Sequence, residues 1–218
     1  MTLLVIAKSP RPGLVKTRLS PAYAPAEAAQ IAAAALHDTL CAALAVPTSR
    51  VVLALDGPTG DWLPAGIEVV PQQGNGLDER IEAAFAHCWA RDSHTPVLLV
   101  GMDTPQVDAG LLHDGSAQLR DPAVDAVLGL ATDGGFWALG LSSPAPGLVA
   151  GVPMSMPDTG ARQLQRLTGG GLRLSMLPEL QDVDTPDDAW SVAASAPAGA
   201  FADVVRRLGR RHVVEGAA

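Results

Sequence analysis

Short apolar runs alternate with longer helical stretches along most of the chain. The runs are rich in Val, Leu and Ile and nearly continuous, which is typical of strands buried on both faces. They predict strands at residues 3–7, 51–55, 67–70, 97–100, 126–130 and 136–141. The intervening stretches predict helices at residues 25–44, 77–90, 107–119, 159–167, 186–194 and 201–208. This order indicates βαβ units, so we expect a three-layer α/β/α fold with a mostly parallel sheet.

The domain organisation follows from the length and from the last predicted elements. A chain of 218 residues fits one large domain better than two. We expect residues 1–194 to form this domain and residues 195–218 to form a C-terminal linker and helical tail. Four arginines surround the end of the last predicted helix: Arg206, Arg207, Arg210 and Arg211.

Charge and composition exclude several classes of partner. The formal net charge of −8 disfavours binding to nucleic acid or to an anionic membrane, because long-range repulsion opposes the approach. No apolar run reaches the roughly 18 residues of a membrane span, and the first run ends at Lys8. Cys41 and Cys88 lack the spacing of a zinc site or of a disulfide framework. We therefore expect a cytoplasmic protein.

The segment KSPRPGLVKTR, residues 8–18, follows the first predicted strand and holds both lysines of the chain. Lys8 and Lys16 stand there beside Arg11 and Arg18, in a turn that contains two prolines and Gly13. Four cations so close together repel one another unless an anion compensates them, and a polyphosphate is a natural compensator. A solvated basic turn is the alternative. The glycine motifs of P-loop and Rossmann proteins are absent from this segment.

Acidic residues follow other predicted strands. Asp103 follows the strand at 97–100 after Gly101 and Met102, and Asp182 and Asp184 precede a predicted helix near the end. Ligands of open α/β sheets bind outside the carboxyl ends of the strands. Magnesium prefers oxygen ligands, often one or two carboxylates together with substrate phosphates. We therefore expect Mg²⁺ (or Mn²⁺) at Asp103 with Asp184 or Asp182, although an ordinary turn would also explain Asp103.

The helix that follows this second cluster has its own sequence signature. Thr185 is a suitable N-cap, and Pro186 occupies the first helical position. Asp187 and Asp188 fall in the first turn, where they favour the helix dipole and a capping box. We expect these last two acids to be structural.

Two further turns could either bind a ligand or have a purely structural role. Asp133-Gly134-Gly135 leads into the strand at 136–141, and the glycines suit either a ligand close to the backbone or a hairpin turn. Gln72 and Gly74 follow the strand at 67–70, where they form a polar turn or an edge that reads a base. Arg80, on the next predicted helix, could reach phosphate or pair with a nearby acid.

Four segments taken together, AKSPRPGLVKTRL, GMDTP, DGGFWALGL and DVDTPDD, resemble one bacterial transferase family. This family is named for its association with radical-SAM and selenoprotein genes and is sometimes labelled arsenosugar-biosynthesis glycosyltransferase. The resemblance extends from about residue 3 to residue 188. It implies the GT-A, or nucleotide-diphospho-sugar transferase, fold. The family is similar to 2-phospho-lactate guanylyltransferase and, more distantly, to cytidylyltransferases and molybdenum-cofactor guanylyltransferases.

The resemblance also implies roles for the candidate residues. The first loop would hold the nucleotide phosphates, with Lys16 foremost and Lys8, Arg11, Gly13 and Arg18 beside it. Asp103 and Asp184 would bind the metal. Gln72 and Gly74 would lie near the base, and Asp133, Gly134 and Gly135 on the acceptor side.

These expectations favour magnesium-dependent transfer of a nucleotidyl group from an NTP to a small phosphorylated or acidic acceptor, with release of pyrophosphate. Lys16, Asp103 and Arg18 are the catalytic candidates. One alternative is glycosyl transfer from an NDP-sugar. Another is a nucleotide-binding protein without turnover, suggested by the apolar residues Met154 and Met156 in the expected acceptor segment. The expected partners are a nucleotide and a small acceptor, and the expectation allows for a homodimer.

Overall fold

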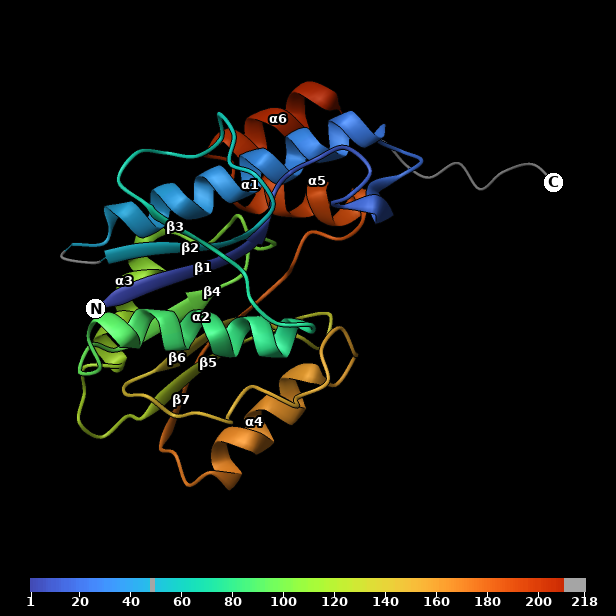
Figure 1. The fold of residues 1–218 in the computed structure, drawn as a ribbon. Helices are drawn as coiled ribbons and strands as arrows, with labels where there is room; N and C mark the ends of the chain where they lie inside the picture. The colour runs from blue at the N-terminus through green and yellow to red at the C-terminus, as the bar shows by residue number, and fades with distance from the viewer. Residues whose placement is uncertain (48–49, 210–218) are drawn as a thin grey trace.

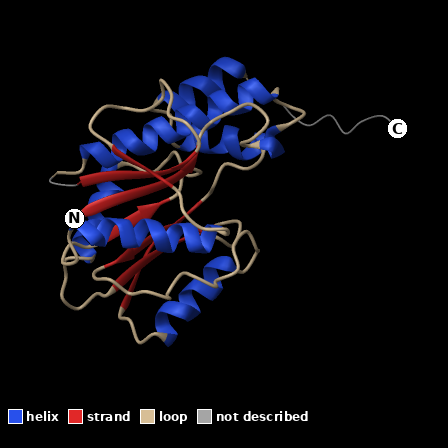
Figure 2. Ribbon diagram, in the orientation of Figure 1, coloured by secondary structure: helices blue, strands red, loops and turns tan. Residues whose placement is uncertain are grey.

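A single seven-stranded sheet forms the centre of the protein, as described by a computed structural model for residues 1–47 and 50–209 (Figure 2). The strand order is β3-β2-β1-β4-β6-β5-β7. Neighbouring strands are parallel except where β6 lies antiparallel between β4 and β5. The bounds are β1 Thr2–Lys8, β2 Arg50–Asp56, β3 Glu68–Pro71, β4 Val97–Val100, β5 Ala126–Ala131, β6 Phe136–Leu141 and β7 Leu174–Leu180.

Helices cover both faces of this sheet (Figure 1). On one face α1 and α3 contribute Leu36, Leu40 and Leu112 to a core with Leu3 and Val5 of β1. The alternate residues of β1 face a second core that includes side chains of α2 and α4. The bounds are α1 Pro25–Ala45, α2 Leu77–Arg91, α3 Ala109–Gln118, α4 Thr159–Gly169, α5 Pro186–Ser195 and α6 Ala200–Leu208, with a short 3-10 helix, η1, at Thr17–Leu19. The predicted three-layer, mostly parallel α/β architecture is confirmed.

The C-terminal helices pack against α1 and form a third core (Figure 1). Phe201 and Val205 of α6 are buried there beside Ile31 of α1. The carboxylate of Asp38, on α1, accepts hydrogen bonds from the backbone nitrogens of Ala200 at 3.0 Å and Phe201 at 2.8 Å, so it caps the start of α6. Residues 210–218 of the predicted tail, with Arg210 and Arg211, lie outside the described residues.

Helix α1 is long and apolar enough to cross a membrane by length and composition alone. In the structure, 56% of its most apolar window is buried against other parts of the protein. Core helices of soluble proteins pass the same test, so this feature is weak support for a membrane span.

Each predicted strand and helix is present with bounds that shift by at most two residues. Strand β7, which among the described strands pairs only with β5 at one edge of the sheet, was not predicted. An edge strand needs no continuous apolar run, and β7 has the sequence LSMLPEL with Pro178 and Glu179 exposed. The free edge therefore explains why this strand lacks the pattern of the buried ones.

Candidate functional site

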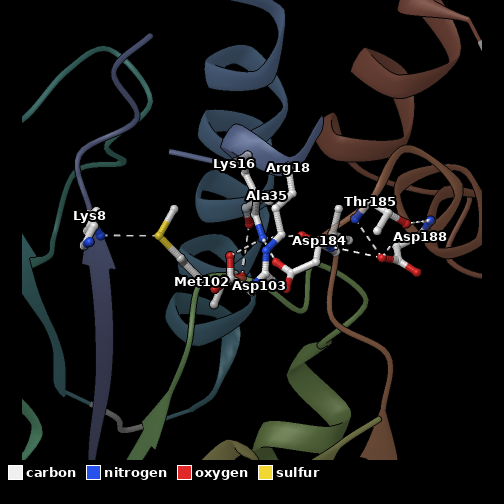
Figure 3. Close-up of polar contacts among 11 residues, drawn as sticks. Lys8, Lys16, Arg18, Ala35, Met102, Asp103, Asp184, Thr185 and Asp188 are labelled. Carbon is white, nitrogen blue, oxygen red and sulfur yellow. Dashed lines mark hydrogen bonds and ion pairs between the residues drawn. The ribbon is translucent and has the colours of Figure 1, made fainter. Parts of the chain in front are cut away.

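The loops after β4 and β7 meet beside the end of β1. The backbone nitrogen of Val183 donates a hydrogen bond to the carbonyl of Asp103 at 2.9 Å. This bond places Asp103 and Asp184 in one cluster, although they are far apart in the sequence (Figure 3). The predicted convergence of these two aspartates is confirmed as a matter of geometry.

Lys16 lies at the centre of this cluster. Its side chain is only 6% exposed, and its ammonium forms an ion pair with Asp103 Oδ1 and donates to the carbonyl of Val183. Asp184 Oδ1 lies 3.6 Å from the same ammonium. The backbone of Lys16 is left-handed, with φ of 49°, directly before η1. The chain thus adopts a sparsely populated conformation where this lysine turns towards the acids.

Arg18 approaches the same carboxylate from solvent. Its Nη1 lies 2.9 Å from Asp184 Oδ2, and its side chain is 77% exposed. Lys16 and Arg18 therefore contact different oxygens of Asp184 in very different environments. Because exposed ion pairs are screened by water and salt, the Lys16 contacts are the stronger electrostatic constraint.

Three carboxylates form a group suited to a metal ion: Asp133, Asp182 and Asp184 each offer an oxygen, and these atoms lie within 4.8 Å of one another. Burial, together with the neighbouring carboxylates of Asp133 and Asp184, raises the pKa of Asp182 to about 6. Oxygen donors of this kind suit Mg²⁺ and Mn²⁺. The predicted metal residues Asp182 and Asp184 belong to this group. The third member is Asp133, predicted as a substrate residue, whereas Asp103 faces Lys16.

Lys8 and Arg11, from the first part of the basic loop at residues 8–18, line a separate cavity of about 220 Å³. Ser9, Leu14 and Asp56 also line it. Lys8 and Asp56 are register partners at the carboxyl ends of β1 and β2. Figure 3 shows Lys8 apart from Lys16. The backbone nitrogen of Lys8 donates to the sulfur of Met102 at 3.3 Å. The four cations of the loop therefore form two pairs, with Lys8 and Arg11 at the cavity and Lys16 and Arg18 at the acids. Gly13, with φ of 77°, lies in the turn between them.

Gln72, Gly74 and Arg80 form a network behind this cavity. The Gln72 amide donates to the carbonyls of Ala7 at 2.9 Å and Ala54 at 3.0 Å, so it ties the ends of β1 and β2 together. Arg80 Nη1 lies 3.0 Å from Asp56 Oδ2, and Arg80 Nε donates to the carbonyl of Gly74 at 3.1 Å. These contacts account for all three residues as supports of the cavity wall. A direct role in reading a base remains a prediction.

The glycine pair before β6 lies close to the start of α4. A Cβ on Gly134 would lie 1.9 Å from the carbonyl oxygen of Pro157, and the backbone nitrogen of Gly160 donates to the carbonyl of Gly134 at 2.8 Å. Asp133 Oδ1 accepts a hydrogen bond from the backbone nitrogen of Gly135 at 2.7 Å. The protein's own backbone therefore occupies the space that Gly134 leaves open, and the turn fixes the Asp133 carboxylate.

The predicted cap of α5 is confirmed. Thr185 Oγ1 accepts from the backbone nitrogen of Asp188 at 3.2 Å, and Asp188 Oδ2 accepts from the backbone nitrogen of Thr185 at 2.7 Å. This capping box fixes the segment directly after Asp184.

The sequence predicted neither Asp56, which lines the cavity, nor the buried hydroxyl of Thr104, next to Asp103. Asp56 ends β2 and lines the cavity, and the rule that directed attention to the carboxyl ends of strands could have found it. Thr104 is 1% exposed, and its hydroxyl has no hydrogen-bond partner among the described residues. Nothing in the sequence marks this hydroxyl, because a Thr before a Pro is ordinary turn chemistry.

The fold is similar to that of several solved proteins. A protein of Desulfovibrio desulfuricans G20, provisionally named a nucleotide-diphospho-sugar transferase, gives a TM-score of 0.86 at 24% identity over 94% of each chain. CMP:2-keto-3-deoxy-manno-octonic acid synthetase, in complex with CTP, gives 0.57 at 15% identity over 89% of this chain and 97% of that one. Rv0371c of Mycobacterium tuberculosis H37Rv, in complex with manganese, gives 0.53 at 22% identity over 88% and 96%.

At these identities the likeness concerns the fold, which is that of nucleotide-diphospho-sugar transferases and cytidylyltransferases. A comparison with curated proteins gives no match. A family model described as "Uncharacterized protein conserved in bacteria (DUF2064)" matches residues 28–156, which is more than half of the chain, and the protein belongs to this family.

Proposed function

We propose that the protein is a nucleotidyltransferase that uses Mg²⁺ or Mn²⁺ to move NMP from an NTP to a small phosphorylated or acidic acceptor. One observation carries this proposal most directly. The buried ammonium of Lys16 and a cluster of aspartates share one position at the end of β1, where open α/β sheets bind their ligands. Cations and carboxylates in this arrangement suit a polyphosphate and its metal ion.

The two halves of the site would have different tasks. Asp133, Asp182 and Asp184 would hold the metal ion, which supplies positive charge to the phosphates when bound. Lys8 and Arg11 would bind the part of the nucleotide that enters the cavity. Lys16 and Arg18 lie between the cavity-lining loop and the acids, where they would neutralise the phosphates that leave.

The proposed step needs positioning and charge neutralisation more than covalent catalysis. An anionic oxygen of the acceptor forms a bond to the α-phosphorus of the NTP. The bond between that phosphorus and the oxygen bridging to the β-phosphorus breaks, and its electron pair leaves with pyrophosphate. An acceptor oxygen that is already ionised releases no proton, so this step requires no general base. Lys16 and Arg18 would compensate the negative charge that develops on pyrophosphate.

Two of the similar structures were solved with a nucleotide or a metal ion, the ligand classes of this proposal. CMP:2-keto-3-deoxy-manno-octonic acid synthetase was solved with CTP, and Rv0371c was solved with manganese. These are properties of those proteins, and the shared fold makes the same ligand classes reasonable candidates for this chain.

Glycosyl transfer from an NDP-sugar is the second candidate. It is favoured by the resemblance to the arsenosugar-biosynthesis family and by the provisional name of the Desulfovibrio protein. The loop offers two pairs of cations, one at the cavity and one at the acids. This charge favours the nucleotidyl reaction, because an NTP carries more negative charge than an NDP-sugar, whose diphosphate is compensated largely by its metal ion. A nucleotide-binding protein without turnover is the third candidate.

Thermal unfolding with a panel of NTPs and NDP-sugars, with and without Mg²⁺, separates these candidates. A ligand at 100 times its dissociation constant adds roughly 2.7 kcal/mol to the free energy of unfolding. We expect stabilisation by one NTP only when Mg²⁺ is present, followed by pyrophosphate release when acceptors are added. A preference for NDP-sugars would support the second candidate, and binding without a product would support the third.

A further inference from the structure

We propose that the Lys16 ammonium acts as an internal cation that competes with the divalent metal ion for Asp184 in the nucleotide-free protein. When metal and nucleotide bind together, Lys16 exchanges the carboxylate for the phosphates. This inference rests on the proposed function, since it concerns the metal and the polyphosphate of the same site. It adds a reason why the metal and the nucleotide should bind cooperatively.

Asp184 belongs to two sets of contacts at once. Its carboxylate is one of the three that could hold a metal ion, with Asp133 and Asp182. The same carboxylate has Lys16 Nζ 3.6 Å from Oδ1 and Arg18 Nη1 2.9 Å from Oδ2. Both of its oxygens therefore already face a protein cation. A metal ion that uses Asp184 must share an oxygen with one of these cations or displace it.

Lys16 is the more effective competitor of the two. Its side chain is 6% exposed, so little water screens its charge, whereas the Arg18 side chain is 77% exposed. Arg18 is closer to Asp184, at 2.9 Å against 3.6 Å, but distance changes the attraction much less than the environment does, because the same pair attracts several times more strongly near a protein interior than in water. Removing the charge of Lys16 should therefore change the affinity for a metal ion far more than removing the equal charge of Arg18.

Three groups of the described residues already hold the Lys16 ammonium while the nucleotide is absent. They are the carboxylates of Asp103 and Asp184 and the carbonyl of Val183. A buried ammonium that loses a carboxylate without gaining another anion is costly. A polyphosphate offers new anionic oxygens in place of the Asp184 carboxylate, so Lys16 leaves Asp184 more readily when phosphate arrives. By linkage, the nucleotide then raises the affinity for the metal by the same factor as the metal raises the affinity for the nucleotide.

The net charge of the cluster also supports competition between Lys16 and a divalent ion. Four carboxylates, those of Asp103, Asp133, Asp182 and Asp184, lie against two protein cations. With all of them ionised, the cluster has a net charge of about −2 by this count, which one divalent ion would balance. The acids can thus accept a metal ion, and the position of Lys16 sets how tightly they do so before a nucleotide arrives.

The test measures Mn²⁺ binding to the nucleotide-free protein from the electron paramagnetic resonance signal of free Mn²⁺. The variants are Lys16→Met and Lys16→Gln, and the matched control is Arg18→Gln, which removes the same charge from the same carboxylate. We expect both Lys16 variants to bind Mn²⁺ at least tenfold more tightly than the wild type, and Arg18→Gln less than threefold. Adding Asp184→Asn to Lys16→Gln should abolish the gain, which excludes binding elsewhere on the acidic surface.

Equal Mn²⁺ affinities in the wild type and in folded Lys16 variants would overturn the inference, as would an equal gain in the Arg18 variant. Circular dichroism establishes that each variant is folded. A parallel titration of the wild type with Mn²⁺ and the panel of NTPs keeps the two claims apart. If that titration shows metal-dependent NTP binding while the Lys16 variants show no gain, only the competition is wrong. If Mn²⁺ binds in neither experiment, the proposed function fails with it.

Discussion

Lys16 Nζ lies 3.6 Å from the carboxylate of Asp184, where the loop after β1 meets the segment after β7. The backbone holds this meeting point together, because the Val183 nitrogen donates to the Asp103 carbonyl and a capping box fixes the helix after Asp184. The side chains of Asp103 and Asp184 make neither of these contacts, so they are additions to the frame. Substitutions of these side chains should change ligand binding and rate more than they change the fold.

Asp103→Asn should leave the fold intact and lower the rate of pyrophosphate release by at least about 10²-fold, as is typical when one preorganised electrostatic group is removed. The Asp103 side chain is 49% exposed, and its backbone carbonyl, which the variant keeps, makes the bond to Val183. Asp114→Asn, an exposed position on α3, is the control and should be neutral. Near-normal turnover in Asp103→Asn would remove this residue from the catalytic machinery.

Asp182→Asn should stabilise the metal-free protein at pH 7. The folded pKa of Asp182 is about 6, above its ordinary value of 3.8, so the folded state binds more protons than the unfolded state between these values. The wild type therefore loses stability as the pH rises from 4 to 6, and the loss persists above pH 6. We expect a gain of about 1 kcal/mol for the variant at pH 7, after allowance for screening, and none below pH 4.

Urea unfolding of both proteins at pH 3.5, 5 and 7 measures this difference. Asp114→Asn, exposed on α3, should show no comparable trend. An Asp182 variant that is less stable than the wild type at pH 7 would contradict the environment described for this carboxylate.

Gly134→Ala should cost about 3 kcal/mol of stability, as the sum of a left-handed backbone and an overpacked contact. Gly134 has φ of 92°, and a Cβ there would lie 1.9 Å from the Pro157 oxygen. Gly147→Ala provides the comparison, since Gly147 has φ of 82° with nothing within 4 Å of the new Cβ. It should cost only about 1 kcal/mol. Equal losses in urea unfolding would show that the contact with Pro157 has no weight.

Asp38→Ala should destabilise the protein by about 1–2 kcal/mol without changing nucleotide binding, because it removes the cap of α6. The lost bonds are those from the backbone nitrogens of Ala200 and Phe201. Asp203→Ala, which removes a 75% exposed carboxylate on the same helix, should change the stability by less than about 0.5 kcal/mol. If the two variants unfold at the same urea concentration, α6 is not held by Asp38.

The fold could be predicted from the sequence because its strands are buried on both faces and its helices are marked by their ends. The capping box at Thr185 and Asp188 and Pro186 in the first turn of α5 are local signals that the structure confirms. Strand β7 escaped prediction since it lies at an edge, where exposed residues such as Met176 replace the apolar run. Local patterns do not reveal which strand occupies an edge.

The candidate site could be predicted in part. The sequence predicts that Asp103 and Asp184 share one site, because ligands of open α/β sheets bind outside the carboxyl ends of the strands. Asp133 reaches the same cluster through the turn before β6, whose antiparallel direction the apolar pattern does not specify. The separation of Lys8 from Lys16 depends on strand register, which makes Lys8 the partner of Asp56.

The central claim is that one metal-bound polyphosphate sits between the basic loop and the aspartates. Isothermal titration calorimetry of the wild type and of Asp184→Asn with the NTP panel, each with and without Mg²⁺, tests it most directly. We expect NTP binding to the wild type to tighten at least tenfold with Mg²⁺ and this gain to vanish in Asp184→Asn. Binding that is indifferent to Mg²⁺, or a gain that survives in Asp184→Asn, would contradict the claim.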